Sequence, residues 1–321
     1  MKVRNLNAAR GLVTAVLLAV LAFVLLVQYA PDSVAFSPNN YGWNGLQGVA
    51  SAYDVNFTLS LSNIPAKGTL VVLQPSINYS AADANSIRSF LLTGGTVLVA
   101  DKSGVANSLL RGIGSSITIE QQFSISDPVY NWKAKSVPTA LVLPGSVADA
   151  PYVANTSGLA LNQPSPIASG GSGVLQLAVT SQFSETQTGS KGPFIVVASE
   201  KIGAGTLIVV GDSQFLLNSE WTIDDNKILI GNLFANGNVF IDTSHWSASP
   251  LTSSTAQVKA GLREAYDAIA AFPARYAFTF GLVLLTLVLV PAEGHDRPDT
   301  PPEEGHPSAT HFNGKKGGAL D

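Results

Sequence analysis

The chain has 321 residues, of which 46% are hydrophobic and 12% are charged, and its formal net charge is −4. This composition excludes a chain that is disordered throughout, and without a basic stripe nucleic acid is not expected as a partner. Cysteine is absent, which excludes disulfides, thiolate nucleophiles and cysteine-based metal sites.

An apolar segment stands near the start of the chain. Residues 11–27 contain 17 residues without a charge, and three basic residues precede them. A run of this length fits a helix that spans a membrane, and basic residues favour the cytoplasmic side of such a helix. We therefore predict a cytoplasmic N-terminus over residues 1–10 and a transmembrane helix over residues 11–29.

The region after this segment begins with an alternation of strands and helices. Residues 69–74 (TLVVLQ) and 96–100 (TVLVA) are short, continuous apolar runs, as is typical of strands buried on both faces. Between them, residues 80–83 have the spacing of a capping box and predict the start of a helix. A second helix is predicted over residues 105–111, closed by Gly112. This order is the signature of parallel strands joined by helical crossovers.

The pattern changes in the middle of the chain and then returns. Residues 121–193 contain short β-like runs between clusters of Pro, Gly and Ser, and we predict a β-rich insertion. Residues 194–198 and 206–210 flank a Gly-Ala-Gly turn at 203–205, which predicts a hairpin. A helix is predicted over residues 224–234, with Asp near its N-terminus.

The apolar runs also predict which residues form the centre of the core. Three of these runs are short, continuous and bounded by turn residues, so we expect them to form adjacent central strands of one sheet. The residues predicted to be buried there are Val71, Val72, Val97, Leu98, Ile208 and Val209.

A second apolar segment lies near the end of the chain. Residues 256–271 predict an amphipathic helix that leads into this segment, and residues 276–292 predict a second transmembrane helix, with a buried core helix as the alternative. The acidic, Pro-rich residues 293–321 are predicted to be a disordered cytoplasmic tail. With two spans, residues 30–275 form an extracytoplasmic α/β domain.

Three Asn-x-Ser/Thr sequons fall within this predicted domain, at Asn56, Asn78 and Asn155. Each is a candidate glycosylation site on an extracytoplasmic domain. A chain rich in Ser, Thr and Asn also produces such triplets by chance, so the sequons are compatible with glycosylation without establishing it.

Three segments carry a resemblance to a known family. Residues 68–101 and 201–233, together with YGWNGLQG at residues 41–48, resemble the membrane-anchored, uncharacterised proteins that carry a class I glutamine-amidotransferase-like domain. The resemblance implies a flavodoxin-like three-layer domain, which here would carry the β-rich insertion and be flanked by the two transmembrane helices. It also implies a place in a cell-envelope assembly, with the lipid membrane, a MoxR-type AAA+ ATPase and von Willebrand A-like membrane proteins as partners.

The same resemblance bears on chemistry. Class I amidotransferases use a cysteine nucleophile activated by histidine. Because this chain has no cysteine, thiol-based amidotransferase chemistry is excluded, and no cofactor is expected.

Polar residues follow the predicted strands and define a candidate crevice. In an open α/β sheet, ligands bind beyond the carboxyl ends of the strands. Ser76, Asp101 and Asp212 occupy such places, and we expect Trp43 and Asn44 to join them. Carboxylates there are able to hold a cation with amide or backbone oxygens. The alternative is that each carboxylate caps a neighbouring helix or loop.

A serine–histidine pair is a candidate catalytic centre. The sequence Gly-Asp-Ser ending at Ser213 is similar to the first block of SGNH-type esterases, and Asp242 with His245 forms an Asp-x-x-His pair. However, only 32 positions separate Ser213 from His245, and the oxyanion blocks of that family are missing. The sequence therefore predicts a catalytically silent domain.

The function predicted from these features is that of a membrane-anchored, catalytically inactive, amidotransferase-like module for protein interaction or ligand sensing in a cell-envelope assembly. Two alternatives remain open at this point. One is an extracytoplasmic serine or metal-dependent hydrolase, and the other is a structural component of the envelope or surface layer.

Overall fold

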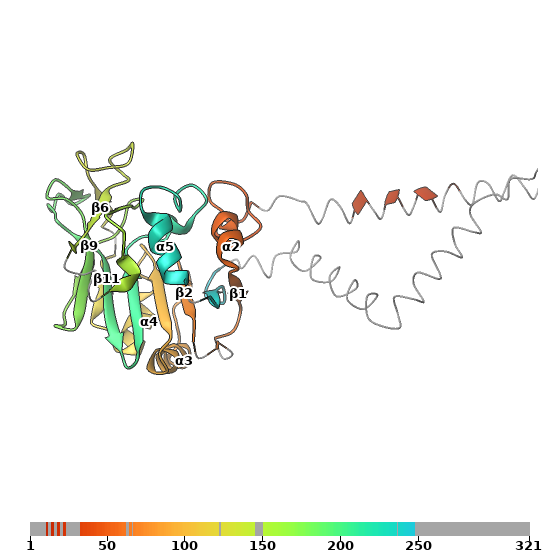
Figure 1. Ribbon diagram of the computed structural model, residues 1–321, viewed down its shortest axis with the longest axis horizontal. Coiled ribbons are helices and arrows are strands. Elements are labelled where there is room, and N and C mark those ends of the chain that lie inside the picture. Colours follow the sequence, from red (N-terminus) through yellow and green to blue (C-terminus); the bar gives the residue numbers. More distant parts are fainter. Residues whose placement is uncertain are drawn as a thin grey trace, which may run out of the picture. The chain divides into compact units, whose positions relative to one another are not determined.

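A nine-stranded mixed sheet forms the centre of the domain that the structure describes (Figure 1). Its strand order is β1-β13-β2-β3-β12-β11-β9-β6-β7. The structure, a computed structural model, describes residues 33–247 apart from 62–63, 66, 122, 145–149 and 236, together with scattered residues between 11 and 23. The strands of this sheet are β1 (Asn56–Thr58), β2 (Thr69–Leu73), β3 (Thr96–Ala100), β6 (Thr139–Val142), β7 (Gly158–Ala160), β9 (Val174–Val179), β11 (Ile195–Ile202), β12 (Gly205–Val210) and β13 (Val239–Asp242).

One half of the sheet is parallel and the other is antiparallel. β1, β13, β2, β3 and β12 run parallel to one another. β11 forms the predicted hairpin with β12, and β9, β6 and β7 continue the sheet in antiparallel fashion. Two small antiparallel pairs complete the strands, namely β4 (Ile117–Ile119) with β8 (Ile167–Ser169) and β5 (Ile125–Ser126) with β10 (Glu185–Thr186).

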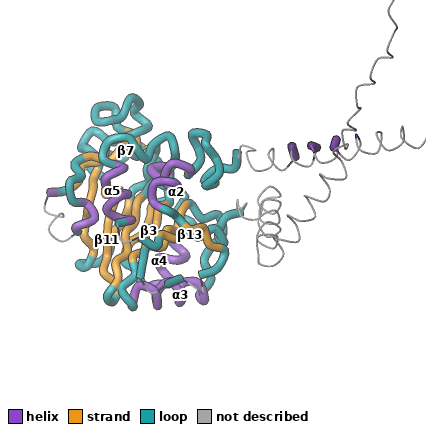
Figure 2. Tube along the Cα trace, turned by 45° about the vertical axis from the view of Figure 1, so that its right-hand side comes forward, coloured by secondary structure: helices purple, strands orange, loops and turns teal. Residues whose placement is uncertain are grey.

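Helices cover both faces of the parallel half (Figure 2). The helices described are α2 (Gln47–Tyr53), α3 (Ala81–Leu92), α4 (Asn107–Ile113), α5 (Asn226–Phe234) and the short 3-10 helices η2 (Pro151–Val153) and η3 (Gln214–Leu216). Successive residues of a strand point to opposite faces, so Val97 packs with α3 and α4, whereas Leu98 packs with α2 and α5. The six residues predicted to form the centre of the core are fully buried on β2, β3 and β12, which confirms that prediction.

The start of α3 follows directly from its sequence. The Ser80 Oγ accepts a hydrogen bond from the Asp83 N–H (3.2 Å), and the Asp83 carboxylate accepts one from the Ser80 N–H (3.0 Å). These reciprocal bonds satisfy backbone donors that the helix itself leaves open, which stabilises the helix by about 1 kcal/mol. The predicted capping box is confirmed.

The predicted end of the next helix was wrong. Residues 105–111 were expected to form a helix closed by Gly112, but α4 extends to Ile113 and is closed by Gly114, whose φ is 80°. Gly112 lies inside the helix, where an added Cβ would lie 2.5 Å from the Cβ of Ala84 in α3. This glycine therefore allows α3 and α4 to pack closely, and Gly114 supplies the left-handed cap.

The predicted flavodoxin-like three-layer α/β fold is wrong. The protein is β-rich, with one mixed sheet of nine strands and four α-helices in the part of the chain that the structure describes. The reason lies in the region predicted as a β-rich insertion, residues 121–193. Its strands β6, β7 and β9 pair onto the free side of β11 and extend the main sheet.

The predicted membrane placement is also corrected. Within the described residues, no helix has the length and apolar character needed to cross a membrane. The two-span topology, and with it the extracytoplasmic location, is therefore unsupported. The predicted segment 11–29 lies mostly outside the described residues, and the segments 256–271, 276–292 and 293–321 lie wholly outside them.

Candidate functional site

The parallel strands end together on one side of the sheet, which we call the carboxyl end. β13, β2, β3 and β12 are consecutive neighbours, so the residues that follow them meet there. Asp101 follows β3 and Asp212 follows β12, and the Asp101 N–H donates to the Val210 carbonyl (3.1 Å). The two predicted carboxylates thus lie at the ends of adjacent strands.

Asp101 is buried and is engaged by the segment that leads into α4. Its Oδ1 accepts hydrogen bonds from the Ser103 N–H and hydroxyl (both 2.7 Å), and its Oδ2 accepts one from the Ala106 N–H (2.9 Å). These contacts agree with the alternative interpretation, in which the carboxylate caps a neighbouring helix or loop, because Asp101 fixes the turn before α4.

Asp212 is fully buried as well. Its Oδ1 accepts a hydrogen bond from the Gln214 N–H (2.8 Å), and its Oδ2 accepts one from the Asn162 N–H (2.8 Å). Burial raises the pKa of Asp212 to about 6, although the backbone hydrogen bonds oppose that shift. A group poised in this way changes charge close to physiological pH.

Glu220 forms a cluster with Asp212 that the sequence pattern had not indicated. The Asn162 side chain donates to Glu220 Oε1 (2.8 Å), so Asn162 binds both carboxyl groups. The Asn226 side chain donates to the carbonyls of Ala160 (2.9 Å) and Glu220 (3.0 Å). Burial, and then the charge of Asp212, raise the pKa of Glu220 to about 7. Asn162, Asp212, Glu220 and Asn226 are called the Glu220 cluster below.

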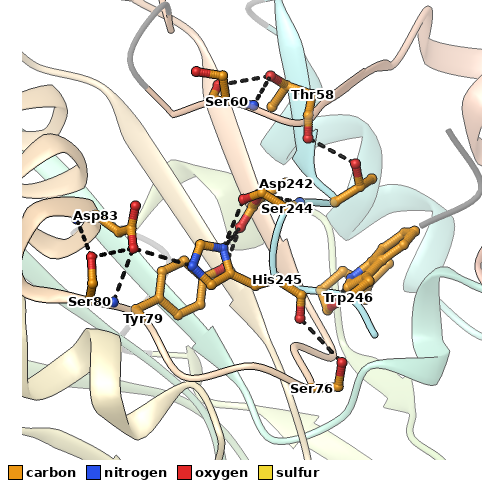
Figure 3. A network of polar contacts seen from close by, with 12 residues as sticks. Thr58, Ser60, Ser76, Tyr79, Ser80, Asp83, Asp242, Ser244, His245 and Trp246 are labelled. Carbon is orange, nitrogen blue, oxygen red and sulfur yellow. Dashed lines mark hydrogen bonds and ion pairs between the residues drawn. The ribbon is translucent and has the colours of Figure 1, made fainter. Parts of the chain in front are cut away.

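A second polar cluster lies at the end of β13 (Figure 3). The Asp242 Oδ2 lies 2.7 Å from the Nδ1 of His245 and accepts a hydrogen bond from the Tyr79 hydroxyl (2.6 Å). The rings of Tyr79 and His245 stack with centroids 3.6 Å apart. The Nε2 of His245 lies 3.5 Å from the Asp83 Oδ2. The imidazole is therefore held between two carboxylates, Asp242 at the end of β13 and Asp83 on α3.

The electrostatics of this second cluster favour a charged histidine. Burial alone would lower the pKa of His245, but the hydrogen bond and charge of Asp242, and then Asp83, raise it above 6.5. Burial likewise opposes ionisation of Asp242, yet hydrogen bonds from His245, Ser244 and Tyr79 hold its pKa below 3.8. The cluster acts as a partly buried ionic clamp between β13 and α3.

This clamp predicts a pH-dependent stability. Replacing His245 with Gln is expected to destabilise the protein by about 1 to 2 kcal/mol near pH 6 and by less near pH 9. The loss is larger at low pH because the pKa of His245 is raised in the folded state. The contribution of His245 to the free energy of unfolding is therefore complete below pH 6.5, and it is lost as the pH rises through the folded-state pKa. Thermal unfolding from pH 5.5 to 9 measures the difference.

The exposed ion pair of Lys191 with Glu185 offers a matched control. Replacing Lys191 with Gln removes a cation of a surface pair, which is worth little, so the melting temperature should hardly change. If His245→Gln lost as much stability at pH 9 as at pH 6, the histidine would contribute through packing and not through its charge.

The structure does not bring Ser213 and His245 together. Ser213 is buried and donates its hydroxyl to the side chain of Gln74, and His245 contacts Asp242, Ser244 and Asp83. β2 and β3 lie between β12, which precedes Ser213, and β13, which precedes His245. At the usual strand spacing, Ser213 and His245 are therefore about 14 Å apart.

A surface groove of about 350 Å³ lies beside His245. It is lined by Leu59, Ser60, Leu61, Ala82, Asp83, Ser86 and Ser244.

The loop before α2 contains the two predicted site residues Trp43 and Asn44. The side chain of Asn40 accepts from the Gly42 N–H (2.7 Å) and donates to Asn44 Oδ1 (2.9 Å). Asn218, from the segment after η3, donates to the carbonyls of Asn40 (2.9 Å) and Gly42 (2.7 Å). Both asparagines thus bind the backbone of the loop and fix its conformation.

The same loop holds two large aromatic side chains in solvent. Tyr41 is 75% exposed and Trp43 is 69% exposed. The Ser219 N–H donates to the Trp43 carbonyl (3.1 Å), so the backbone at Trp43 is fixed while its ring is free of the core. We call residues 40–45 the aromatic loop.

The remaining predicted residues are Ser76, which lies beside the second cluster, and the three sequon asparagines. Ser76 is exposed, and its N–H donates to the His245 carbonyl (2.8 Å), so it binds the chain after β13. The sequon residues Asn56, Asn78 and Asn155 are all exposed. Exposure alone does not indicate glycosylation, so the glycoprotein prediction is unsupported.

Some residues of these clusters were missed at the level of sequence. Tyr79 and Glu220 have no motif around them, and their roles arise from contacts 163 and 58 positions away, to Asp242 and Asn162. Asp83 did carry a signal, since it belongs to the capping box, but that signal indicated a helix start and not a partner for His245. Among the described residues, no group of three or more His, Asp or Glu side chains is arranged to hold a metal.

Comparisons with solved structures give distant similarities. The chain is 14% identical to a structure titled "mmIFT52 N-terminal domain", covering 65% of this chain and 96% of that one, with a TM-score of 0.49. A β-galactosidase from Bacillus circulans sp. alkalophilus is 18% identical, with 61% and 24% covered and a TM-score of 0.30. The exo-β-1,4-mannosidase Op5Man5 from Opitutaceae bacterium strain TAV5 is 13% identical, with 52% and 24% covered and a TM-score of 0.27. The chain spans about a quarter of each glycosidase, and at these TM-scores the similarities carry no argument about function.

The family comparison corrects the resemblance drawn from sequence. No curated protein matches the chain. The family model that matches, over residues 35–234, is described as "Domain of unknown function (DUF4350)" and not as a glutamine amidotransferase. The expected membership of the amidotransferase-like family is therefore wrong. Because the match spans more than half of the chain, this protein belongs to the DUF4350 family.

Proposed function

We propose that the described domain is a non-catalytic binding module whose contact surface is the aromatic loop. The observation that carries this proposal is the exposure of Tyr41 and Trp43 on a backbone that hydrogen bonds hold in place. Side chains of this kind at 75% and 69% exposure gain much apolar burial when a partner covers them.

The fixed backbone of the loop supports the proposal on energetic grounds. Ordering a flexible loop at the moment of binding costs free energy, and a loop that is already ordered avoids that cost. Asn40 and Asn218 provide the order here, since together they bind the loop backbone at Gly42 from both sides. Trp and Tyr are also the residue types that dominate binding energy at protein interfaces. We therefore favour a protein as the partner.

The polar residues at the carboxyl end favour binding over catalysis. A hydrolase needs a nucleophile within hydrogen-bond reach of a base. Ser213 is buried against Gln74, and the Nε2 of His245 faces the Asp83 carboxylate. The membrane-protein partners expected from the amidotransferase-like resemblance, a MoxR-type ATPase and von Willebrand A-like proteins, rest on that resemblance alone and stay predictions.

The test removes the two aromatic rings. In a Tyr41→Ser, Trp43→Ser double variant, we expect recovery of cross-linked partner protein to fall at least about tenfold, because residues of this type carry most of the energy of an interface. The melting temperature should stay nearly the same, since both rings lie outside the core. The measurement is quantitative mass spectrometry after cross-linking the full chain in extracts of its source cells.

Trp132 provides the matched control, because it is a partly exposed tryptophan, at 38%, in a different part of the chain. Trp132→Ser should leave partner recovery unchanged. If the double variant recovers as much partner protein as the wild type, the aromatic loop is not the contact surface. Turnover of ester, amide or glycoside substrates by the wild-type chain, lost in Ser213→Ala or His245→Gln, would instead favour a hydrolase.

A further inference from the structure

The Glu220 cluster contains acceptor atoms that the protein leaves without donors. Among the described residues, the buried side-chain atoms that lack a hydrogen-bond partner are Glu220 Oε2 and Asn226 Oδ1. Glu220 is 6% exposed, and Asn226 and Asp212 are fully buried. An unmet buried acceptor costs about 1 to 3 kcal/mol, and more if it is charged. Two such atoms in one cluster therefore require an explanation.

The contacts of Asn226 identify which atom of its side-chain amide has no hydrogen-bond partner. Its Nδ2 donates to two carbonyl oxygens, those of Ala160 and Glu220. A flipped amide would place oxygen against both carbonyls, so the orphan atom is the amide oxygen. The unmet atoms of the cluster are thus both oxygens, one from a carboxylate and one from an amide.

The two carboxyl groups of the cluster are linked through a single residue. Asn162 donates its backbone N–H to Asp212 and its side-chain amide to Glu220. Each carboxylate oxygen has two lone pairs, so both groups retain acceptor capacity after these bonds. The cluster therefore contains two buried acids and one buried amide oxygen that retain unused acceptor capacity.

We propose that the Glu220 cluster binds a hard divalent cation of the Ca²⁺ class, with Asp212, Glu220 and Asn226 as oxygen ligands. Ca²⁺ takes carboxylate, amide and carbonyl oxygens in flexible geometry, whereas Mg²⁺ requires a near-ideal octahedron and retains more water. The buried, all-oxygen donor set fits the first better than the second. A divalent charge also relieves the cost of burying two acids.

Charge around the cluster is consistent with this assignment. Lys102 is close enough for its charge to lower the pKa of both Asp212 and Glu220. One ammonium group offsets one of two carboxylates, which leaves a net negative charge for a cation to neutralise. A hydrogen bond also connects this part of the chain to the aromatic loop, because the N–H of Ser219, the residue before Glu220, donates to the Trp43 carbonyl. The assignment itself does not depend on what the loop binds.

The first experiment measures stability with added metal. The full chain is stripped of metal with EDTA, dialysed to pH 8, and melted with 0 to 5 mM CaCl₂ or MgCl₂. We expect CaCl₂ to raise the melting temperature by about 5 °C, because a ligand that binds only the folded state stabilises it, and MgCl₂ to raise it less. Glu220→Gln should abolish the response. Glu185→Gln, the same change at an exposed surface carboxylate, should keep it.

The second experiment needs no variant that weakens the cluster. Tb³⁺ occupies Ca²⁺ sites, and a neighbouring indole sensitises its emission, so Trp221 should give a Tb³⁺ signal in the wild-type chain that added CaCl₂ displaces. Lys102→Met should strengthen Ca²⁺ binding several-fold by removing the competing charge. If the wild type shows neither a Ca²⁺ shift nor displaceable Tb³⁺ emission, the orphan oxygens are met by protons or water alone and the site is refuted. A Ca²⁺ response that persists in Glu220→Gln would place the cation elsewhere and refute it equally.

Discussion

Replacing Val97 with Asp is expected to prevent the domain from folding. Val97 is fully buried in β3, paired with Leu70 of β2 and Leu207 of β12, and it packs with α3 and α4. A carboxylate there would have no described cation beside it, and burying it unpaired costs several kcal/mol in addition to the lost apolar contacts. A domain of this kind is stable by about 5 to 15 kcal/mol. One such substitution therefore removes most or all of its stability.

The measurement is the soluble yield of the full chain and the presence of a cooperative thermal transition. Val129→Asp provides the matched control, because it makes the same change at a valine that is 57% exposed, where a charge stays hydrated. We expect the control to melt like the wild type. A soluble Val97→Asp chain with a cooperative transition at an ordinary temperature would show that β3 is not central to the sheet.

The parallel half of the sheet was predictable because its signals are local. The runs that form β2, β3 and β12 are continuous and apolar, which is what strands buried on both faces require. The capping box at Ser80 and the turn between β11 and β12 are also encoded within a few residues. Each of these elements can therefore be predicted from its own residues alone.

The antiparallel half was not predictable in the same way. The region 121–193, which contains β6, β7 and β9, was predicted to be β-rich as a whole, but the residues of a strand do not specify which other strand it pairs with. β9 pairs with β11, and β6 then pairs with β9, across register shifts and long connections. Pairing of this kind depends on the whole fold, so reading the region as a separate insertion led to the wrong fold class.

The candidate site was also predictable only in part, and for the same reason. The positions of Asp101 and Asp212 followed from the rule that parallel strands end together, and the structure places both there. Their contacts did not follow, because they involve Asn162 and a turn at Ser103. Glu220 joins Asp212 only through the tertiary fold, so sequence spacing held no sign of the cluster.

Replacing Gly45 with Ala is expected to release the aromatic loop and to destabilise the domain by about 3 kcal/mol. A Cβ at position 45 would lie 1.9 Å from the Asn40 carbonyl oxygen, which is a backbone atom and has no rotamer to move aside. The Asn40 carbonyl also accepts a hydrogen bond from Asn218. The methyl group therefore forces apart the contacts that fix Tyr41 and Trp43.

Two measurements separate the loop from the rest of the fold. Chymotrypsin cleaves after aromatic residues, and it requires a locally opened backbone, so Gly45→Ala should be cut at Tyr41 or Trp43 many times faster than the wild type. The melting temperature reports the loss of stability. Gly173→Ala is the matched control, since an added Cβ there meets nothing within 4 Å.

The two outcomes of this substitution bear differently on the proposed function. If Gly45→Ala loses partner recovery along with the order of the loop, while both aromatic rings are still present, then the fixed backbone is needed for binding and not only the apolar area. This is expected, because a released loop must be ordered again at the moment of association. If Gly45→Ala is cleaved rapidly and yet retains full partner recovery, the hydrogen bonds of Asn40 and Asn218 serve stability alone. The partner would then bind through another surface of the domain.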